Sequence, residues 1–294
     1  PMSAGFAERV GASILRAAVR RLQPGYRVCP ERFVSTSDTL IGDPQYGFPC
    51  PWLTTHSQGG GRGFDAYHSS ADLSGLLSPA GLATCAASMA AYLYFLASMD
   101  EAQAAQLAAW ETQRTVAQVQ AAPLGPDEAA YAAAAHAENM RRLRRWMAGP
   151  QQGELAARTD AWSAQVRRVC GPAVRPAARR RLPAGGGLIP RRTAPLSPTA
   201  ENLPGPAAAR IARAGVPPWA LFWADGRRTI AQIAAMVACE SSPRVNASPA
   251  PPREAVDVER LVDFFAAHAA LGYCGPLEAA ASARRSAAPP SARR

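Results

Sequence analysis

The first hundred residues combine helical and extended hydrophobic patterns. Apolar residues at helical spacing run through residues 5 to 22 with arginines on the opposite face, which predicts an amphipathic helix that ends at Pro24-Gly25. Short strands are predicted at residues 26 to 29 and 48 to 55, and two prolines in the second strand favour a position at a sheet edge. Because helix, strand, polar loop and helix follow one another, residues 1–99 are predicted to belong to an α/β domain.

A long helix is predicted to begin at Ser78 and Pro79, because serine is a good N-cap and proline suits the first helical position. The pattern breaks near Asp100, and residues 100–170 then predict a helical hairpin or small bundle with a turn at residues 123 to 126. The helix that begins at Pro79 is expected to pack against a sheet through an apolar stripe formed by Leu82, Ala86, Met89, Leu93 and Leu96.

The composition changes in the C-terminal part. Residues 171–215 are rich in Pro, Gly, Arg and Ala, which predicts a linker or a strap over the surface. Residues 216–278 predict three helices and a terminal strand, similar to a winged-helix unit: an aromatic helix at residues 218–223, a helix with a Thr229–Gln232 capping box, and a helix that stops at Gly272. The join between the last two helices is too long for helix-turn-helix DNA readout. A packing or protein-contact role is therefore favoured for this unit. Residues 279–294 are of low complexity and are expected to be disordered.

The predicted fold is thus an α/β fragment followed by a mainly α-helical extension with a small winged-helix-like unit. The net charge of +10 comes from arginine alone, since the chain has no lysine, and this compositional bias makes the charge weak support for a nucleic-acid partner. None of the six cysteines forms a C-x-x-C pair, so reduced, buried thiols and a cytoplasmic location are expected. No run of 18 apolar residues or signal-peptide pattern is present, which predicts no membrane span. An initial proline in place of methionine favours a fragment or a processed start.

The candidate chemistry lies in residues 65–72, Asp-Ala-Tyr-His-Ser-Ser-Ala-Asp. An imidazole, hydroxyls and carboxylates crowd together here without helical or strand periodicity, and a glycine-rich turn at residues 59 to 63 precedes them. Polar loops presented by a rigid scaffold commonly carry binding and catalytic groups. We interpret this stretch, with its lead-in at residues 35–44, as the rim of an active site.

Residues 65–72 resemble the Tyr-His-Thr-Ser-x-Asp signature of co-catalytic zinc exopeptidases, the leucyl-aminopeptidase type that includes the glutamate carboxypeptidases. Residues 37–44 are similar to a Ser-Asp-His-x-x-x-x-Asp-Pro stretch that some bacterial members place upstream. Residues 190–196 and 222–229 are similar to C-terminal extensions in that bacterial group.

The resemblance implies roles for four residues. His68 would be the last zinc ligand, Asp72 would support the metal ligands or cap the following turn, and Tyr67 and Asp38 would line the substrate pocket. In such enzymes two zinc ions hold the attacking water and the scissile carbonyl, and a glutamate acts as general base.

The chain departs from the family pattern at the remaining ligands. A first histidine, a bridging aspartate, a glutamate pair and a further aspartate are expected upstream of Ser37, where this chain has no histidine and no Glu-Glu pair, and Thr39 stands where the family often has histidine. Because catalytic zinc needs three protein ligands, we predict no catalytic residue, no tight zinc and no peptidase activity in this chain alone. A missing N-terminal half would complete the enzyme, whose substrate is a peptide.

The other histidines offer no second site. His56 ends the second predicted strand and could reach the polar loop, whereas His136 and His268 lie in helical patterns and are predicted to be structural. No G-x-S-x-G elbow, phosphate loop or dinucleotide fingerprint is present. The alternative hypothesis is a non-enzymatic interaction or DNA-binding protein that uses the winged-helix-like unit and the arginine-rich linker.

Overall fold

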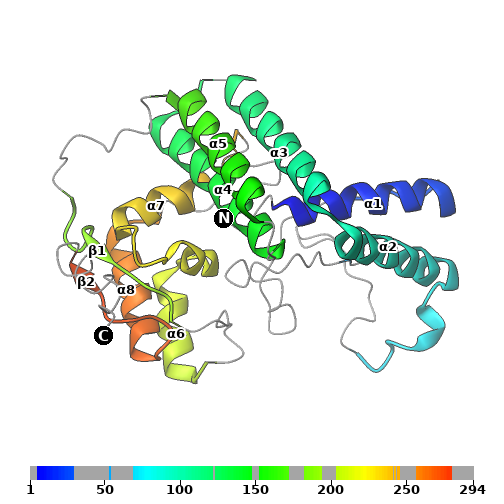
Figure 1. Cartoon of the computed structure of the whole chain (residues 1–294). Helices are drawn as coiled ribbons and strands as arrows, with labels where there is room; N and C mark the ends of the chain where they lie inside the picture. The colour runs from blue at the N-terminus through cyan, green and yellow to red at the C-terminus, as the bar shows by residue number, and fades with distance from the viewer. Residues whose placement is uncertain are drawn as a thin grey trace, which may run out of the picture.

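The computed structural model describes residues 5–29, 53, 69–121, 123–147, 152–171, 182–193, 203–240, 242, 244–245 and 256–279. This part of the chain is mainly α-helical (Figure 1). Its elements are α1 (Phe6–Leu22), the 3-10 helix η2 (Ser74–Leu76), α2 (Pro79–Ser98), α3 (Glu101–Ala121), α4 (Pro126–Trp146), α5 (Gln152–Cys170), β1 (Leu188–Ile189), α6 (Gly205–Ala214), the 3-10 helix η5 (Pro218–Trp223), α7 (Ile230–Cys239), α8 (Val258–Ala270) and β2 (Glu278–Ala279).

Helices α1 and α2 lie side by side at one end of the molecule (Figure 1). α1 begins one residue after the predicted start and ends at Leu22 as predicted. Gln23 is its C-cap, and the Gln23 N–H donates to Val19 O at 2.8 Å just before Pro24. α2 begins as predicted, because Ser78 Oγ accepts the Gly81 N–H at 3.1 Å. The predicted strand at residues 26 to 29 is wrong: these residues have no regular structure, and no strand pairs with them among the described residues.

The predicted buried stripe of α2 is right only in part. Leu96 is buried, but Leu82 and Leu93 are 53% and 55% exposed, and Ala86 is exposed as well. Besides Leu96, the helix buries Thr84, Ser88 and Tyr92. The hydroxyls on this face are satisfied within the helix, since Thr84 Oγ1 donates to Ala80 O at 2.9 Å and Ser88 Oγ donates to Thr84 O at 2.6 Å. These bonds remove most of the cost of burying the hydroxyls, so the polar side of α2 can face its neighbours.

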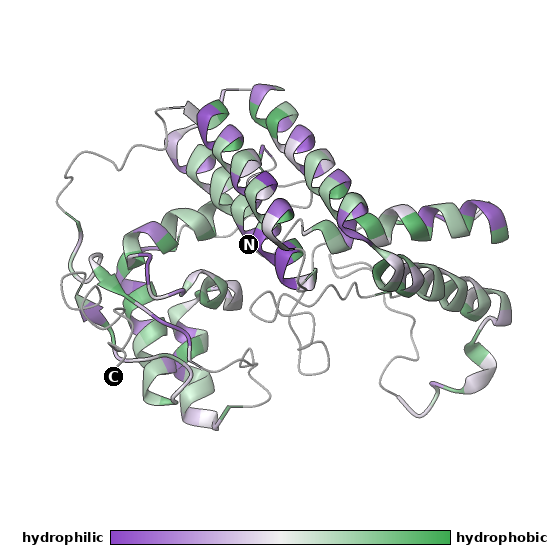
Figure 2. Ribbon diagram, in the orientation of Figure 1, coloured by the Kyte–Doolittle hydropathy of each residue, from purple (hydrophilic) through white to green (hydrophobic). Residues whose placement is uncertain are grey.

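α2 also alters the expectation about membranes. Among the described residues it is the one helix long and apolar enough to cross a bilayer, with a mean hydropathy of 1.5 over 18 residues, of which 22% are buried. Figure 2 shows no strongly hydrophilic segment along α2, whereas α1 and α4 have hydrophilic ends. The expectation that no segment has the length and composition of a span is therefore not met, although core helices of soluble proteins meet both criteria as well.

Helices α3, α4 and α5 form the predicted bundle. α3 begins after the predicted break, where Asp100 and Gln103 exchange hydrogen bonds: Gln103 N–H donates to Asp100 Oδ1 at 2.8 Å, and Asp100 N–H donates to Gln103 Oε1 at 3.0 Å. Fully or nearly fully buried alanines on α3, such as Ala104 and Ala108, allow the neighbouring helices to approach closely.

The C-terminal helices share a core with the bundle. The capping box of Thr229 and Gln232 begins α7, and Gly272, with φ 76°, follows the end of α8, both as predicted. The aromatic helix η5 is a 3-10 helix whose Trp223 packs on Tyr131 of α4 with ring centroids 5.7 Å apart. One core therefore spans α4, α5 and the C-terminal helices, and a second core joins α1 and α2 to the bundle.

The segment predicted to be a linker is partly ordered into this unit. β1 pairs antiparallel with β2, and Arg191 and Arg192 bridge to Asp225 and Cys274. α6 also falls within it and ends at Gly215 in the left-handed conformation, with φ 63°. Residues 182–193 thus form the strap that was one of the two predictions for this segment. Residues 205–214 are helical because they are rich in alanine, although the segment as a whole is dominated by Pro, Gly and Arg.

Substituting Gly272→Ala is expected to lower the free energy of unfolding by about 1 kcal/mol, because a side chain at positive φ is strained. No neighbouring atom lies within 4 Å of a Cβ built there, so the cost comes from the backbone alone. Gly153→Ala in α5 is the control, because it also meets open space but is helical, and it should not destabilise. Chemical denaturation measures the free energy of unfolding of both variants. Equal losses would contradict the left-handed conformation assigned to Gly272.

Candidate functional site

Most of the predicted active-site rim lies outside the described residues. Asp38, His56, Tyr67 and His68 are all in this category. Asp72 is described: it is exposed, its N–H donates to Ser69 O at 3.1 Å, and it does not cap the following 3-10 helix, whose N-cap is Leu73 without a side-chain hydrogen bond. Within the described ranges no group of three His, Cys, Asp or Glu residues could hold a metal ion. The roles given to these four residues by the resemblance stay predictions.

His268 is embedded in α8. It is 1% exposed, its Nδ1 lies 2.8 Å from Phe264 O, and its ring centroid is 4.2 Å from that of Phe264. Burial lowers the pKa of His268, while the hydrogen bond to Phe264 opposes this shift. The side chain packs and holds the end of the helix.

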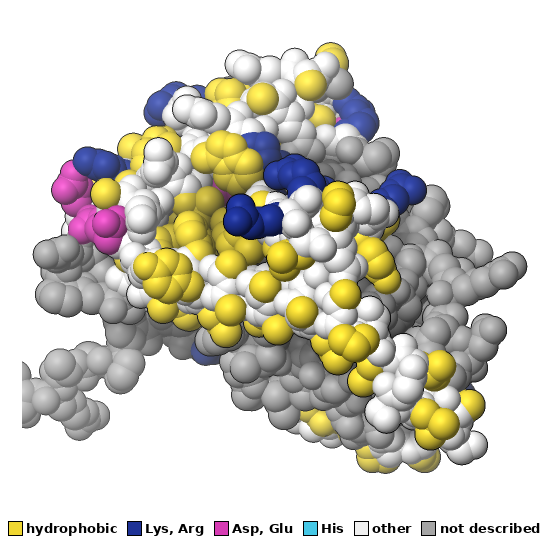
Figure 3. All heavy atoms as spheres, turned by 90° about the vertical axis from the view of Figure 1, so that its right-hand side faces the viewer, with side chains coloured by type: hydrophobic (Ala, Val, Ile, Leu, Met, Phe, Trp, Pro, Cys, Tyr) yellow, Lys and Arg dark blue, Asp and Glu magenta, His cyan; other side chains and the backbone are white. Residues whose placement is uncertain are grey.

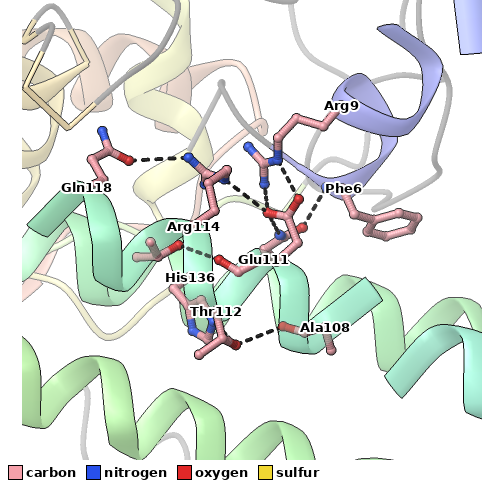
Figure 4. Close-up of polar contacts among 10 residues, drawn as sticks. Phe6, Arg9, Ala108, Glu111, Thr112, Arg114, Gln118 and His136 are labelled. Atoms are coloured by element: carbon pink, nitrogen blue, oxygen red, sulfur yellow. Dashed lines mark hydrogen bonds and ion pairs between the residues drawn. The ribbon is translucent and has the colours of Figure 1, made fainter. Parts of the chain in front are cut away.

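The described residues instead bring together a buried polar cluster where α1 meets the bundle (Figure 4). We call it the Glu111 cluster, and its members are Arg9, Glu111, Thr112, Arg114, His136 and Asn139. Its centre is the Glu111 carboxylate on α3, which is 0% exposed. A buried carboxylate is stable only when it is paired and hydrogen-bonded, so the arrangement of its partners determines how these helices meet.

Three side chains surround Glu111. Two guanidinium nitrogens of Arg9 on α1 donate to the two carboxylate oxygens, a bidentate pairing. Asn139 Nδ2 on α4 donates to Glu111 Oε2 at 3.0 Å, and Arg114 Nε lies 3.7 Å from the same oxygen. The carboxylate thus links α1, α3 and α4.

Asn139 also anchors the start of α1. Its Oδ1 accepts the Phe6 N–H at 2.8 Å, a bond that is buried and joins residues 133 positions apart. The first N–H groups of a helix have no partner inside the helix, and the preceding residue, Gly5, has no side chain to supply one. α4 therefore caps α1 from a distant part of the chain.

His136 lies on the α4 side of the cluster and is 4% exposed. Thr112 Oγ1 donates to Ala108 O at 2.8 Å, so its oxygen accepts from His136 Nε2–H at 3.0 Å, and this assigns the tautomer. His136 Nδ1 is buried without a hydrogen-bond partner. Burial, followed by the charges of Arg114, Arg9 and Arg167, lowers the pKa of His136 to about 4, so the ring is neutral at neutral pH.

A small cavity adjoins the cluster. Its volume of about 20 Å³ is enough for one water and too small for a peptide. It is lined by Arg9, Arg114, Thr115, Gln118, Tyr131, Ala132, Ala135, His136, Asn139 and Val245. The cluster has no serine or thiol nucleophile, and its one carboxylate is engaged by arginine. We conclude that it is a structural junction between α1 and the bundle rather than a catalytic centre.

The sequence carried one usable sign of this junction. Glu111 follows Ala104 and Ala108 at spacings of seven and three, so it lies on the buried stripe of α3. On α4, His136 and Asn139 share the stripe of Leu143 in the same way. Polar residues at core positions of two neighbouring helices indicate a buried network.

No protein-family model, curated protein or solved structure matches this chain.

Glu111→Gln is expected to lower the free energy of unfolding by about 3 kcal/mol, because Arg9 is then left largely buried beside a neutral amide. Glu154→Gln is the matched control: its pair with Arg158 is 67% and 52% exposed and should contribute less than about 1 kcal/mol. Urea unfolding measures both variants. Equal losses in the two would show that the Glu111 pairing does not hold the helices together.

His136 is expected to make stability fall on acidification. Its pKa is about 4 in the folded chain and near 6.5 when unfolded, so the unfolded state takes up a proton first as the pH drops. The free energy of unfolding should therefore decrease between about pH 6.5 and pH 4, by roughly 3 kcal/mol in all, from this group. Unfolding midpoints of the parent and His136→Gln across this range test it. If the unfolding midpoints of the two proteins change in parallel with pH, the pKa of His136 is not lowered in the folded chain.

Proposed function

We propose that this chain is the C-terminal portion of a zinc-dependent exopeptidase of the aminopeptidase type. In the complete enzyme it contributes His68 to a two-zinc site that hydrolyses peptide bonds. Its first part, up to α2, belongs to the catalytic α/β domain, and the bundle and the C-terminal helices extend that domain.

The observation that carries the proposal is the sequence of residues 65–72 together with the helix that follows it. α2 begins only seven residues after Asp72 and is uncharged along its whole length. A long helix without charged residues is typical of the interior of a larger domain. Here 22% of its apolar window is buried, which fits a helix separated from the rest of its domain.

The residues of this chain do not suffice for a metal centre. Bound zinc would supply an activated water and polarise the scissile carbonyl. His68 would offer one neutral imidazole nitrogen, whereas a catalytic zinc needs three protein ligands and an open position. Tyr67 and Asp38 would line the substrate pocket and Asp72 would support the ligands. We therefore assign no catalytic step to this chain alone.

The buried thiols fit a reducing compartment, and we propose the cytoplasm. Cys170, Cys239 and Cys274 are buried and unpaired by disulfides. Burial, with nearby carboxylates, raises the pKa of Cys239 to about 12, so this thiol is unreactive.

The alternative, a DNA-binding role for the C-terminal unit, has less support. Arg192 of the strap is 8% exposed and lies over the ring of Phe222 at 5.8 Å. A guanidinium used in this way contributes to packing and has little surface left for phosphate.

The coding DNA immediately upstream of this chain is expected to encode, in frame or nearly so, a histidine, an aspartate and a Glu-Glu pair. The polypeptide that joins both parts should bind two zinc ions by elemental analysis and cleave aminoacyl-nitroanilides. His68→Ala should lower kcat/KM at least about a hundredfold, since ligand loss exceeds the effect of losing a residue that supports a ligand. His136→Gln is the histidine control and should keep its zinc.

This chain alone should bind no stoichiometric zinc and show no hydrolysis. Stoichiometric zinc with aminopeptidase activity in the isolated chain would contradict the partial site. An upstream region without these ligands would contradict the peptidase assignment.

A further inference from the structure

Exposed hydrophobic side chains gather on the side of the molecule that α1 and α2 form. Figure 3 shows this concentration, with arginines along part of its edge. Of the ten large hydrophobic residues that are exposed in the described ranges, eight belong to α1, α2 and the segments next to them. We call these the α1–α2 face: Leu22, Tyr26, Leu73, Leu76, Leu77, Leu82, Leu93 and Tyr94. Monomeric soluble proteins rarely leave such a patch without a partner.

Charge is distributed unevenly around this face. Residues 73–99 contain no charged residue. α1 supplies the charge at the edge, with exposed Arg16, Arg20 and Arg21, and its last acidic residue is Glu8. A partner that fits must therefore be apolar at its centre and negative where it meets α1.

Two occupants fit this pattern poorly. A second copy of the chain paired through the same face would bring the arginine edges of α1 together, and like charges across an interface are repulsive. α2 has the length and hydropathy of a span, but it fits a membrane surface poorly, because helices that lie on a membrane use Trp, Phe and Leu on the apolar side. The exposed positions of α2 include seven alanines: Ala80, Ala83, Ala86, Ala87, Ala90, Ala91 and Ala97.

A polypeptide partner fits the same features. Small side chains let another backbone approach closely, and the exposed leucines and Tyr94 can fill hollows on the partner. The side of α2 that carries Thr84, Ser88 and Tyr92 is already buried in this chain, so the exposed apolar side is the one left for docking.

We propose that the α1–α2 face is the docking surface for a second polypeptide segment whose apolar surface is bordered by acidic residues. The inference rests on the proposed function, under which that segment is the upstream catalytic portion that carries the remaining zinc ligands. Docking covers the exposed side of α2, the helix that follows residues 65–72 in the sequence.

The test titrates this chain with the separately produced polypeptide encoded upstream, by calorimetry. Leu93→Asp should weaken binding at least tenfold, because a carboxylate would then have to lose its water inside an apolar interface. Leu182→Asp is the matched control, since Leu182 is exposed to a similar degree, 50% against 55%, and lies outside the face. Arg20→Glu with Arg21→Glu should weaken binding severalfold and reduce its salt dependence, whereas Arg168→Glu on α5 should not.

Each failure has its own signature. Equal binding by the Leu93→Asp and Leu182→Asp variants, with zinc still bound by the complex, overturns the docking surface and leaves the peptidase assignment. A complex that binds no zinc overturns the peptidase assignment. This chain could instead float with phosphatidylglycerol vesicles or form a dimer in light scattering. Either result overturns the choice of partner if the Leu93→Asp variant loses that behaviour and the Leu182→Asp variant keeps it.

Discussion

The buried carboxylate of Glu111 joins parts of the chain that are far apart in sequence. It binds Arg9, 102 positions away, and through Asn139 it is connected to the first N–H of α1. Because a carboxylate without partners in this environment is strongly unfavourable, the position of α1 on the bundle is tightly constrained. α2 packs on α1, so the place of the whole α1–α2 pair depends on this contact.

That constraint has a consequence for the surface of the molecule. With α1 held by its polar contacts, α2 turns its hydroxyl-bearing side inward together with Leu96, and leaves Leu82 and Leu93 exposed. The bundle and the C-terminal helices bury their aromatic and aliphatic side chains in a continuous core and leave no comparable surface in the described residues. The molecule thus has a well-packed C-terminal half and an N-terminal layer that is packed on one side, which agrees with the proposal that the N-terminal layer is part of a larger domain.

Sequence reasoning succeeded where the signal was local. The Ser78 cap, the Thr229–Gln232 capping box and Gly272 are each set by a few neighbouring residues, and the structure confirms all three.

Sequence reasoning failed where the outcome depended on distant partners. The strand predicted at residues 26 to 29 lacks a partner among the described residues, and the leucine spacing of α2 could not reveal that its threonine and serine face would be the buried one. The Glu111 cluster was missed because its members come from three helices, although a glutamate on an alanine stripe was a visible sign. For the metal site, His68, Tyr67 and Asp38 lie outside the described residues, so that part of the prediction is still to be tested.

Hydrogen–deuterium exchange of the α1 amides tests the central role of Glu111 most directly. In the parent chain, α1 should exchange through the same cooperative opening as the buried amides of α3 and α4. In Glu111→Gln, exchange of α1 should become faster than that of α4 by at least tenfold, as the helix separates from a bundle that stays folded. If α1 and α4 keep the same relative protection in the variant, Glu111 does not hold α1 in place, and the account of how the α1–α2 layer is positioned is wrong.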